Sequence, residues 1–298
     1  MSASTRPAPA RWSVSWRAVG IGCLVALFAV YLLAPFAWIV RTSFMIEADA
    51  LAVPPQWVPQ QPTLANYQGF FQPTPEQQLV GSRAVAEMPR ALLNSAVVAT
   101  GTALVNLLLA SLAAYSFARL RFRGSQALLL LYLTSRMVPG VAIIIPFFLL
   151  MRALGLLDTY LALILSYTTF TLPFTIWILK DYFRSIPRDL EDAARVDRCT
   201  WLGMMWRVFL PISAPGLVAA AVFAFMFAWN EFLFALFLTS TINSKTAPLV
   251  VANFATDLRV LFTFMSAAGV LAVIPPLALA LVFQRLIVRG LAAGAVKG

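Results

Sequence analysis

Long apolar runs alternate with short polar segments along this chain. A helix needs about 20 apolar residues to cross the hydrocarbon core of a bilayer. Runs of that length should be helices, because lipid cannot satisfy free backbone groups. They are too long and too uniformly apolar for the alternating strands of an outer-membrane barrel. The pattern therefore predicts an all-α, polytopic membrane protein with spans at about 18–40, 91–118, 125–151, 160–179, 211–238 and 261–283, six transmembrane helices in all.

Composition supports a lipid environment. Hydrophobic residues make up 61% of the chain and charged residues 11%, whereas a soluble domain has about 25% charged residues. The first apolar run follows three arginines, as in a signal peptide, but it is longer than the roughly 7–15 residues of a signal-peptide core and is expected to be retained. The chain contains no His, and its two cysteines, Cys23 and Cys199, fall in different environments, so neither a metal site nor a disulfide is expected.

The distribution of Lys and Arg predicts the orientation. With the N-terminus in the cytoplasm, fifteen of these residues fall in inside segments and six in outside segments. This is the bias that cytoplasmic loops carry. It accounts for the net charge of +10 better than nucleic-acid binding does. The expected organisation is a cytoplasmic tail at 1–17, a transmembrane domain at 18–288 and a second cytoplasmic tail at 289–298, with residues 42–90 outside, against the membrane surface or a partner.

The most polar stretch, residues 187–208, lies between the fourth and fifth spans and is predicted to be cytoplasmic. Pro187 suits a first helical turn, and the acids that follow favour a helix N-terminus. The helical pattern breaks near 197–199, and Thr200 is a plausible N-cap for a second short helix through Val208. In the first helix, an apolar face is predicted at Leu190, Ala193, Ala194 and Val196.

This stretch resembles a signature of the inner-membrane permease subunits of binding-protein-dependent ABC importers. That signature is Glu-Ala-Ala, three residues, Gly, nine residues, then Ile-x-Leu-Pro. Here Asp192-Ala193-Ala194 precedes Arg198 and, nine residues later, Val208-Phe209-Leu210-Pro211. The spacing is kept, while Asp192 replaces Glu and Arg198 replaces Gly. If the glycine position needs a positive φ, Arg198 costs about 1 kcal/mol there.

Other stretches agree with this resemblance. Residues 182–187 resemble the lead-in to this signature, and residues 113–119, 123–124, 229–233 and 289–298 resemble the matching parts of sugar permeases similar to the G-type subunit of the maltose transporter. The likeness runs from about residue 20 to the end of the chain.

The resemblance implies that residues 187–208 are a coupling segment that contacts a separate ATPase. No GxxxxGK[ST] phosphate loop occurs in the chain, so ATP and Mg are expected on that partner, with no catalytic residue and no cofactor here. The implied assembly contains a second permease subunit as a heterodimer, two ATPase subunits and an external solute-binding protein, in the inner membrane of a prokaryote. The coupling residues are expected to be Glu191, Asp192, Ala193, Ala194, Asp197, Arg198, Leu210 and Pro211, with a further C-terminal ATPase contact at Gly290, Gly294, Lys297 and Gly298.

Three polar residues within the apolar runs are candidates for the translocation path: Arg136, Asn230 and Glu231. Charged groups inside a membrane are usually functional or paired. Arg136 either lines the path or pairs with Glu231. The aromatic run at 223, 225, 227 and 229 is interpreted as helix packing rather than as a platform for a sugar.

The expected cargo is a di- or oligosaccharide, with glycerol phosphate or another small polar solute as the alternative. A secondary transporter working without ATP is an alternative of another class. It should show intramembrane acids for ion coupling or an inverted repeat, and neither is clear in this sequence. A membrane enzyme is not supported, because no His, metal-ligand cluster or activated nucleophile is found.

Overall fold

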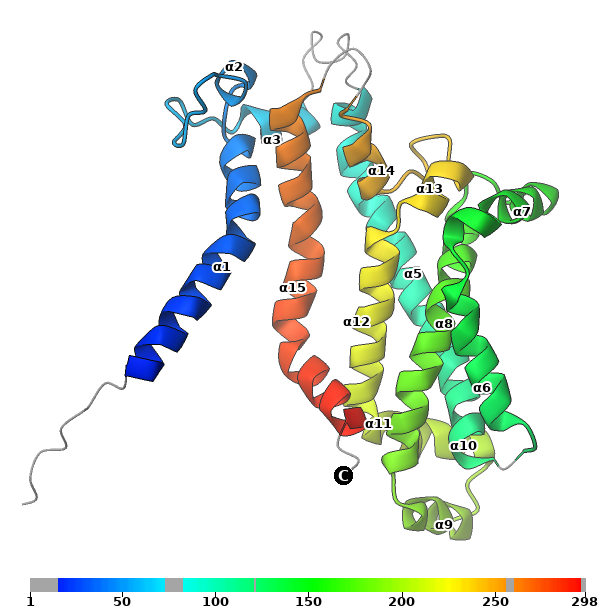
Figure 1. Cartoon of the computed structure of the whole chain (residues 1–298). Helices are drawn as coiled ribbons and strands as arrows, with labels where there is room; N and C mark the ends of the chain where they lie inside the picture. Colours follow the sequence, from blue (N-terminus) through cyan, green and yellow to red (C-terminus); the bar gives the residue numbers. More distant parts are fainter. Residues whose placement is uncertain (1–15, 73–82, 121, 256–259, 296–298) are drawn as a thin grey trace, which may run out of the picture.

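The computed structural model describes residues 16–72, 83–120, 122–255 and 260–295. Every element longer than an isolated bridge in these ranges is a helix, which confirms the predicted all-α class. Four helices are long and apolar enough to cross a membrane. They are α1 (Trp16–Ser43), α5 (Arg83–Arg119), α8 (Tyr160–Ser185) and α15 (Phe262–Ala295). In Figure 1, α5, α8 and α15 run side by side with α12, while α1 leans outward and meets α15 near one end.

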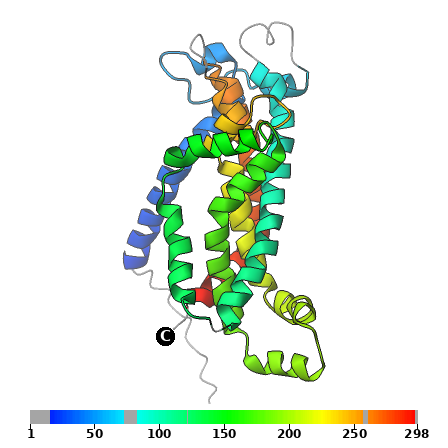
Figure 2. The same cartoon turned by 90° about the vertical axis from the view of Figure 1, so that its right-hand side faces the viewer.

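The expected third span is bent rather than straight. It consists of α6 (Ser125–Thr134), the short helix η1 (Ser135–Met137) and α7 (Gly140–Ala153), with an angle of 96° between the two arms. Figure 2 shows α7 lying across the end of the bundle while α6 runs along it. Pro139 explains the break, because proline has no N–H to donate and it disfavours a helical conformation at the preceding residue. Val138 is accordingly extended.

The expected fifth span is also divided. A helix of three short parts, α10 (Trp201–Met204), η2 (Met205–Phe209) and α11 (Leu210–Ile212), meets α12 (Ala214–Asn230) at 83°. At the other end α12 stops at Asn230, and a separate helix, α13 (Leu233–Leu238), follows. The described residues thus hold four candidate spans, or six if each bent pair counts as one.

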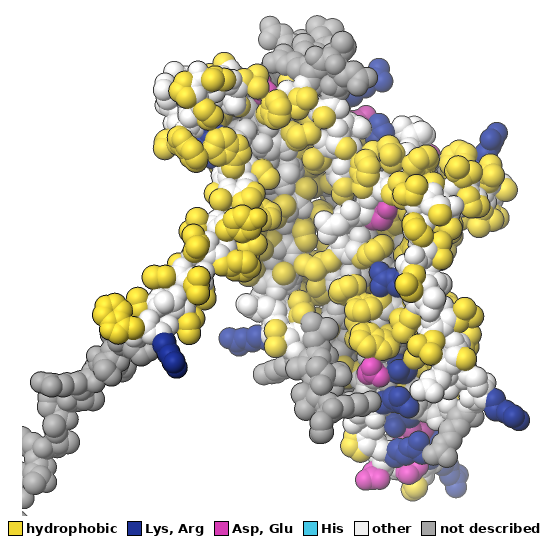
Figure 3. All heavy atoms as spheres, in the orientation of Figure 1, with side chains coloured by type: hydrophobic (Ala, Val, Ile, Leu, Met, Phe, Trp, Pro, Cys, Tyr) yellow, Lys and Arg dark blue, Asp and Glu magenta, His cyan; other side chains and the backbone are white. Residues whose placement is uncertain are grey.

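The two ends of the bundle differ in character. The start of α1, the end of α15, the polar helix α9 (Arg188–Val196) and the short helices α10 and α11 lie at one end in Figure 1. The short helices α2 (Glu47–Ala50), α3 (Ala65–Phe71), α13 and α14 (Ala247–Ala252) lie at the other end. In Figure 3, acidic and basic side chains gather toward the end that carries α9, and hydrophobic side chains dominate the middle. We call the end with α9 the polar end and the opposite one the far end.

The segment after α1 packs on its own chain at the far end. Asn66 donates to the carbonyl oxygens of Ser43 and Met45 at 2.9 and 2.8 Å. Glu47 accepts hydrogen bonds from the first amides of α15, Phe262 at 3.0 Å and Thr263 at 3.1 Å. These contacts satisfy amides that a helix start leaves free. Residues 43–71, expected against the membrane surface or a partner, therefore cover the end of α15.

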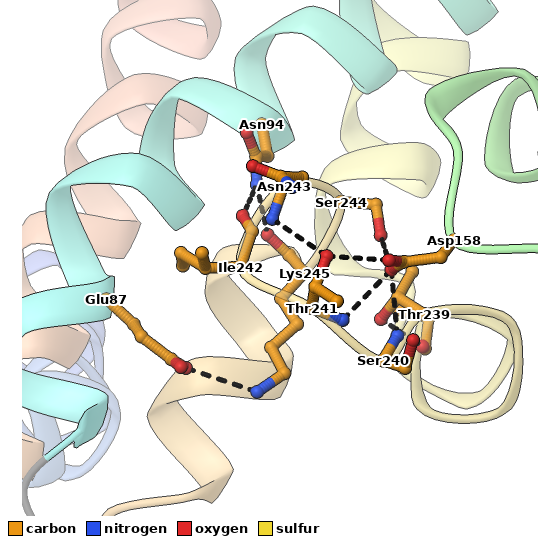
Figure 4. Close-up of polar contacts among 11 residues, drawn as sticks. Glu87, Asn94, Asp158, Thr239, Ser240, Thr241, Ile242, Asn243, Ser244 and Lys245 are labelled. Carbon is orange, nitrogen blue, oxygen red and sulfur yellow. Dashed lines mark hydrogen bonds and ion pairs between the residues drawn. The ribbon is translucent and has the colours of Figure 1, made fainter.

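A polar clamp joins three elements at the far end, and Figure 4 shows it in detail. Asp158, just before α8, accepts hydrogen bonds from the amides of Ser240 and Thr241 at 2.9 and 3.0 Å and from two hydroxyls, those of Thr241 and Ser244. Asn94 of α5 donates to the carbonyl oxygens of Ile242 and Lys245, each at 2.8 Å. The segment between α13 and α14 is thereby fixed to α5 and to the start of α8.

Candidate functional site

The polar segment forms the predicted pair of short helices. Pro187 is the N-cap of α9, and Asp189 and Glu191 stand in its first turn. Thr200 caps α10 as expected, because its hydroxyl oxygen accepts a hydrogen bond from the Gly203 amide at 3.1 Å. The second helix does not stop at Val208. It continues through a π-helical turn at 205–209 and through α11 to Ile212.

Arg198 makes the turn between the two helices. It has a φ of 56°, the left-handed conformation that glycine adopts without strain. Its amide donates to the Arg195 carbonyl and the Cys199 amide to the Ala194 carbonyl, both at 3.0 Å. This pair of bonds is the Schellman motif that ends many helices. The turn therefore keeps the geometry that a glycine would give, although an arginine occupies the position.

Glu191 is turned into the protein. It is only 7% exposed, and its carboxylate forms ion pairs with Arg119 of α5 at 3.5 Å and with Arg195 at 2.8 Å. The hydroxyl of Tyr115 donates to the same carboxylate at 3.3 Å. Arg119 also donates to the carbonyl oxygen of Ile186 at 2.6 Å. These bonds tie the start of α9 to the end of α5.

An aromatic cluster packs α10 and η2 against the ends of α5 and α8. Phe209 is fully buried, with its ring 4.9 Å from that of Tyr115 and 5.6 Å from that of Phe183. The guanidinium of Arg119 lies 5.2 Å from the centre of the Phe209 ring. The polar segment is therefore held rigidly against α5 and α8.

The expected coupling residues divide into an exposed set and a buried set. Ala194 and Glu191 are buried within this chain. Leu190, Ala193 and Val196, expected to share an apolar face with Ala194, are exposed, so this chain covers only the Ala194 part of that face. Leu210 is half-buried and Pro211 exposed. The residues that remain available on α9 and its turn are Asp192, Ala193, Asp197 and Arg198.

Sequence reasoning missed Arg119 and Tyr115 as partners of Glu191. A partial signal was present, because Arg119 is a basic residue in the last turn of a span whose end is predicted on the same side of the membrane as the acidic segment. Two members of the C-terminal candidate set, Gly290 and Gly294, lie in the last turns of α15. Lys297 and Gly298 fall outside the described residues.

Arg136 and Glu231 do not form an ion pair in the structure. Arg136 lies in η1 with its guanidinium 5.6 Å from the ring centre of Phe174 and 5.7 Å from that of Phe227. The Glu231 carboxylate instead accepts hydrogen bonds from the amides of Phe234 at 3.0 Å and Ala235 at 3.4 Å. Glu231 thereby caps α13 and stabilises the break in the expected fifth span.

Asn230 and Glu231 line a cavity of about 400 Å³ beside α12. Its other walls are apolar and aromatic: Phe223, Met226, Phe227 and Phe232. Part of the aromatic run packs as expected, since Trp229 is buried, stacks on Phe225 at 5.5 Å and donates to the Ala272 carbonyl at 2.9 Å. Phe223 also packs, with its ring centre 4.4 Å from that of Phe174, and both Phe223 and Phe227 line the cavity. In the described part of the chain, no group of three or more His, Cys, Asp or Glu residues is placed to hold a metal.

Comparison with known sequences decides the family. Residues 106–293 match the family described as "Binding-protein-dependent transport system inner membrane component". The chain belongs to this family. It is therefore a multi-pass permease of the inner membrane, with the transport role of that family.

Curated relatives cover nearly the whole permease. The trehalose transport system permease protein SugB of Mycobacterium tuberculosis is 38% identical over 95% of this chain and 98% of its own length. The sulfoquinovosyl glycerol transport system permease protein SmoH of Agrobacterium fabrum is 38% identical over 89% of this chain and 88% of its own. The trehalose/maltose transport system permease protein MalG of Thermococcus litoralis is 34% identical over 91% of this chain and 94% of its own.

A solved structure has the same fold as this permease. A chain of a bacterial ABC transporter involved in the import of the acidic polysaccharide alginate superposes with a TM-score of 0.76, at 22% identity. The superposition covers 93% of this chain and 99% of that one. The arrangement of bent and straight helices described above is thus one that a transporter subunit adopts.

Proposed function

We propose that this permease is the membrane-spanning subunit of an ATP-driven, binding-protein-dependent importer of a di- or oligosaccharide. The observation that carries this proposal is the 38% identity to a trehalose permease over 95% of this chain. A second relative, named for trehalose and maltose, aligns over 91% of it. The proposed assembly contains a second permease, two ATPase subunits that hold ATP and Mg, and an external solute-binding protein.

In this proposal α9 is the coupling helix. Asp192, Ala193, Asp197 and Arg198 form its exposed contact surface for the ATPase, and Ala193 allows close approach. Movement of α9 is transmitted through the chain, since Pro187 joins it to α8, and α10 and α11 join it to α12. The ion pair of Glu191 with Arg119 adds a third link, to α5. Alternating access needs rigid elements of this kind that move together.

We place part of the sugar path at the cavity beside α12. Ligand pockets are mostly apolar, with a few polar groups that fix orientation. Here Phe223 and Phe227 offer aromatic faces, while Asn230 and Glu231 offer groups for sugar hydroxyls. Arg136 lies beside Phe227 and borders the same region. The partner permease supplies the facing wall.

The proposed topology has six spans, with each bent pair counted as one, and the polar end in the cytoplasm. This places α9, both termini and the C-terminal ATPase contact on one side of the membrane. The bias of Lys and Arg toward those segments supports the orientation.

The function is tested by reconstituting the full complex in lipid vesicles with its solute-binding protein and labelled trehalose, maltose and glycerol phosphate. We expect uptake of a disaccharide only when ATP is on the side of the ATPase. The control omits the ATPase and should show no uptake. Uptake of glycerol phosphate but of neither sugar would overturn the assignment of the cargo, and uptake without the ATPase would overturn the mechanism.

A further inference from the structure

Four arginines line a cavity of about 550 Å³ at the polar end. Arg119 and Arg123 come from the end of α5 and the turn that follows it, and Arg184 and Arg188 from the end of α8 and the start of α9. No acidic residue is among the residues that line it. The remaining walls are formed by Phe117, Ala118, Leu120, Phe122 and Ser125. The cavity is therefore strongly cationic and has an apolar rim.

Three of these arginines form no ion pair with a carboxylate of the described residues. Arg123, Arg184 and Arg188 are exposed. Among the residues that the structure describes, the ion pairs join Arg119 and Arg195 to Glu191, Lys180 to Asp181, and Lys245 to Glu87. Three unneutralised guanidinium groups around one cavity repel one another, so an anion bound between them would relieve that repulsion.

In the proposed topology the cavity lies at the membrane boundary, where three helices of the bundle begin or end. The apolar helix α5 ends at Arg119, α8 ends at Ser185, and α6 begins at Ser125. From that rim α6 leads away with Leu128, Leu130 and Leu131 exposed by 45%, 61% and 66%. A cationic cavity at the membrane boundary beside an exposed leucine surface matches the two halves of a phospholipid.

We propose that this cavity binds the headgroup of an anionic phospholipid, with an acyl chain along the exposed face of α6. Guanidinium groups bind phosphate oxygens in a bidentate manner, and basic pockets between membrane helices bind lipid headgroups. Arg184 and Arg188 flank Pro187, the junction between α8 and α9. A bound lipid therefore holds the start of the polar segment at the membrane surface, independently of what the permease transports.

The test measures binding of phosphatidylglycerol to the purified full-length chain in detergent by native mass spectrometry. The test variant carries Arg123→Gln and Arg184→Gln. The matched control carries Arg83→Gln and Arg152→Gln, which remove two exposed arginines at the far end. A variant with Arg123→Lys and Arg184→Lys keeps the charge and should keep most of the binding. Phosphatidylcholine and inorganic phosphate serve as comparison ligands.

We expect the test variant to bind phosphatidylglycerol about 30-fold more weakly, since each basic residue near an anionic lipid contributes about fivefold. Binding of phosphatidylglycerol to the control variant should change by less than about twofold. Phosphatidylcholine should bind poorly to all variants. An equal loss in the test and control variants, or no loss in either, would overturn the proposal. Displacement of the lipid by inorganic phosphate at equal concentration would overturn the assignment to a lipid.

Discussion

Arg119 at the end of α5 and Glu191 at the start of α9 form an ion pair whose side chains are 5% and 8% exposed. Glu191 also accepts a hydrogen bond from the Tyr115 hydroxyl, and Arg119 donates one to the Ile186 carbonyl. Burying an ion pair costs free energy, because both charges lose their contact with water. Here the pair fixes the orientation of α9, because it turns Glu191 inward and leaves Asp192 outward.

Removal of one partner of this pair should destabilise the protein. Glu191→Ala leaves Arg119 buried without a counter-charge, and such a loss costs about 3–5 kcal/mol. Arg195→Ala, which removes the partner exposed by 63%, should cost less than about 1 kcal/mol. The free energy of unfolding of the purified chain, followed by tryptophan fluorescence in detergent, measures both. Equal losses of unfolding free energy in the two variants would show that the Glu191–Arg119 pair contributes no more to stability than the Glu191–Arg195 pair.

The turn at Arg198 should become more stable when glycine replaces the arginine. Because Arg198 has a φ of 56°, Arg198→Gly removes a steric cost of about 1 kcal/mol. Arg198→Val should destabilise the protein, because a β-branched residue tolerates a positive φ poorly. The midpoint of thermal unfolding should rise for the first variant and fall for the second. A fall for Arg198→Gly would contradict the account of the turn.

The clamp at the far end should weaken in acid. Burial alone would raise the pKa of Asp158, but hydrogen bonds from Ser244, Thr241 and the Ser240 amide lower it from 3.8 to about 2. A depressed pKa contributes stability that is present above 3.8 and lost as the pH falls toward 2. After allowance for solvent screening, this contribution is about 1 kcal/mol.

The matching variant is Asp158→Asn, which keeps the shape of the side chain and removes its charge. The difference in unfolding free energy between the wild type and this variant should shrink as the pH falls from about 6 to about 3. A difference that does not change with pH would show that the charge of Asp158 does not hold the segment between α13 and α14.

Close contact between α8 and α12 depends on Gly216. A Cβ atom at this position would lie 2.5 Å from the ring of Tyr182, so Gly216→Ala should destabilise the protein by about 1–3 kcal/mol through overpacking. Gly22→Ala in α1 is the control, because nothing lies within 4 Å of its added Cβ. The unfolding midpoint of both variants tests this. An unchanged midpoint for Gly216→Ala would mean that Tyr182 moves aside freely.

The periodicity of the sequence predicted the helices but not their breaks. Apolar composition marks a run as suited to lipid, yet it does not show where Pro139 bends the third span or where the Glu231 carboxylate starts α13. Both breaks depend on backbone hydrogen bonds that only three-dimensional structure reveals. The N-cap at Thr200 could be predicted, because capping is local to a few residues.

The face of α9 could not be predicted from its pattern. The sequence predicts an apolar face that includes Leu190 and Val196, but these side chains are 41% and 82% exposed in the structure. The helix instead turns Glu191 inward, because Arg119 from a distant part of the sequence meets it there. Such a contact between distant parts of the sequence cannot be read from the pattern of one helix.

In the proposed coupling, the exposed face of α9 carries the contact with a separate ATPase. The most direct measurement is the amount of ATPase that copurifies with the chain when it carries Asp192→Lys, with Asp49→Lys at the far end as the control. We expect Asp192→Lys to lose most of the ATPase while the chain remains folded and inserted, and Asp49→Lys to retain it. Full retention of the ATPase by Asp192→Lys, with a normal rate of transport, would contradict the account.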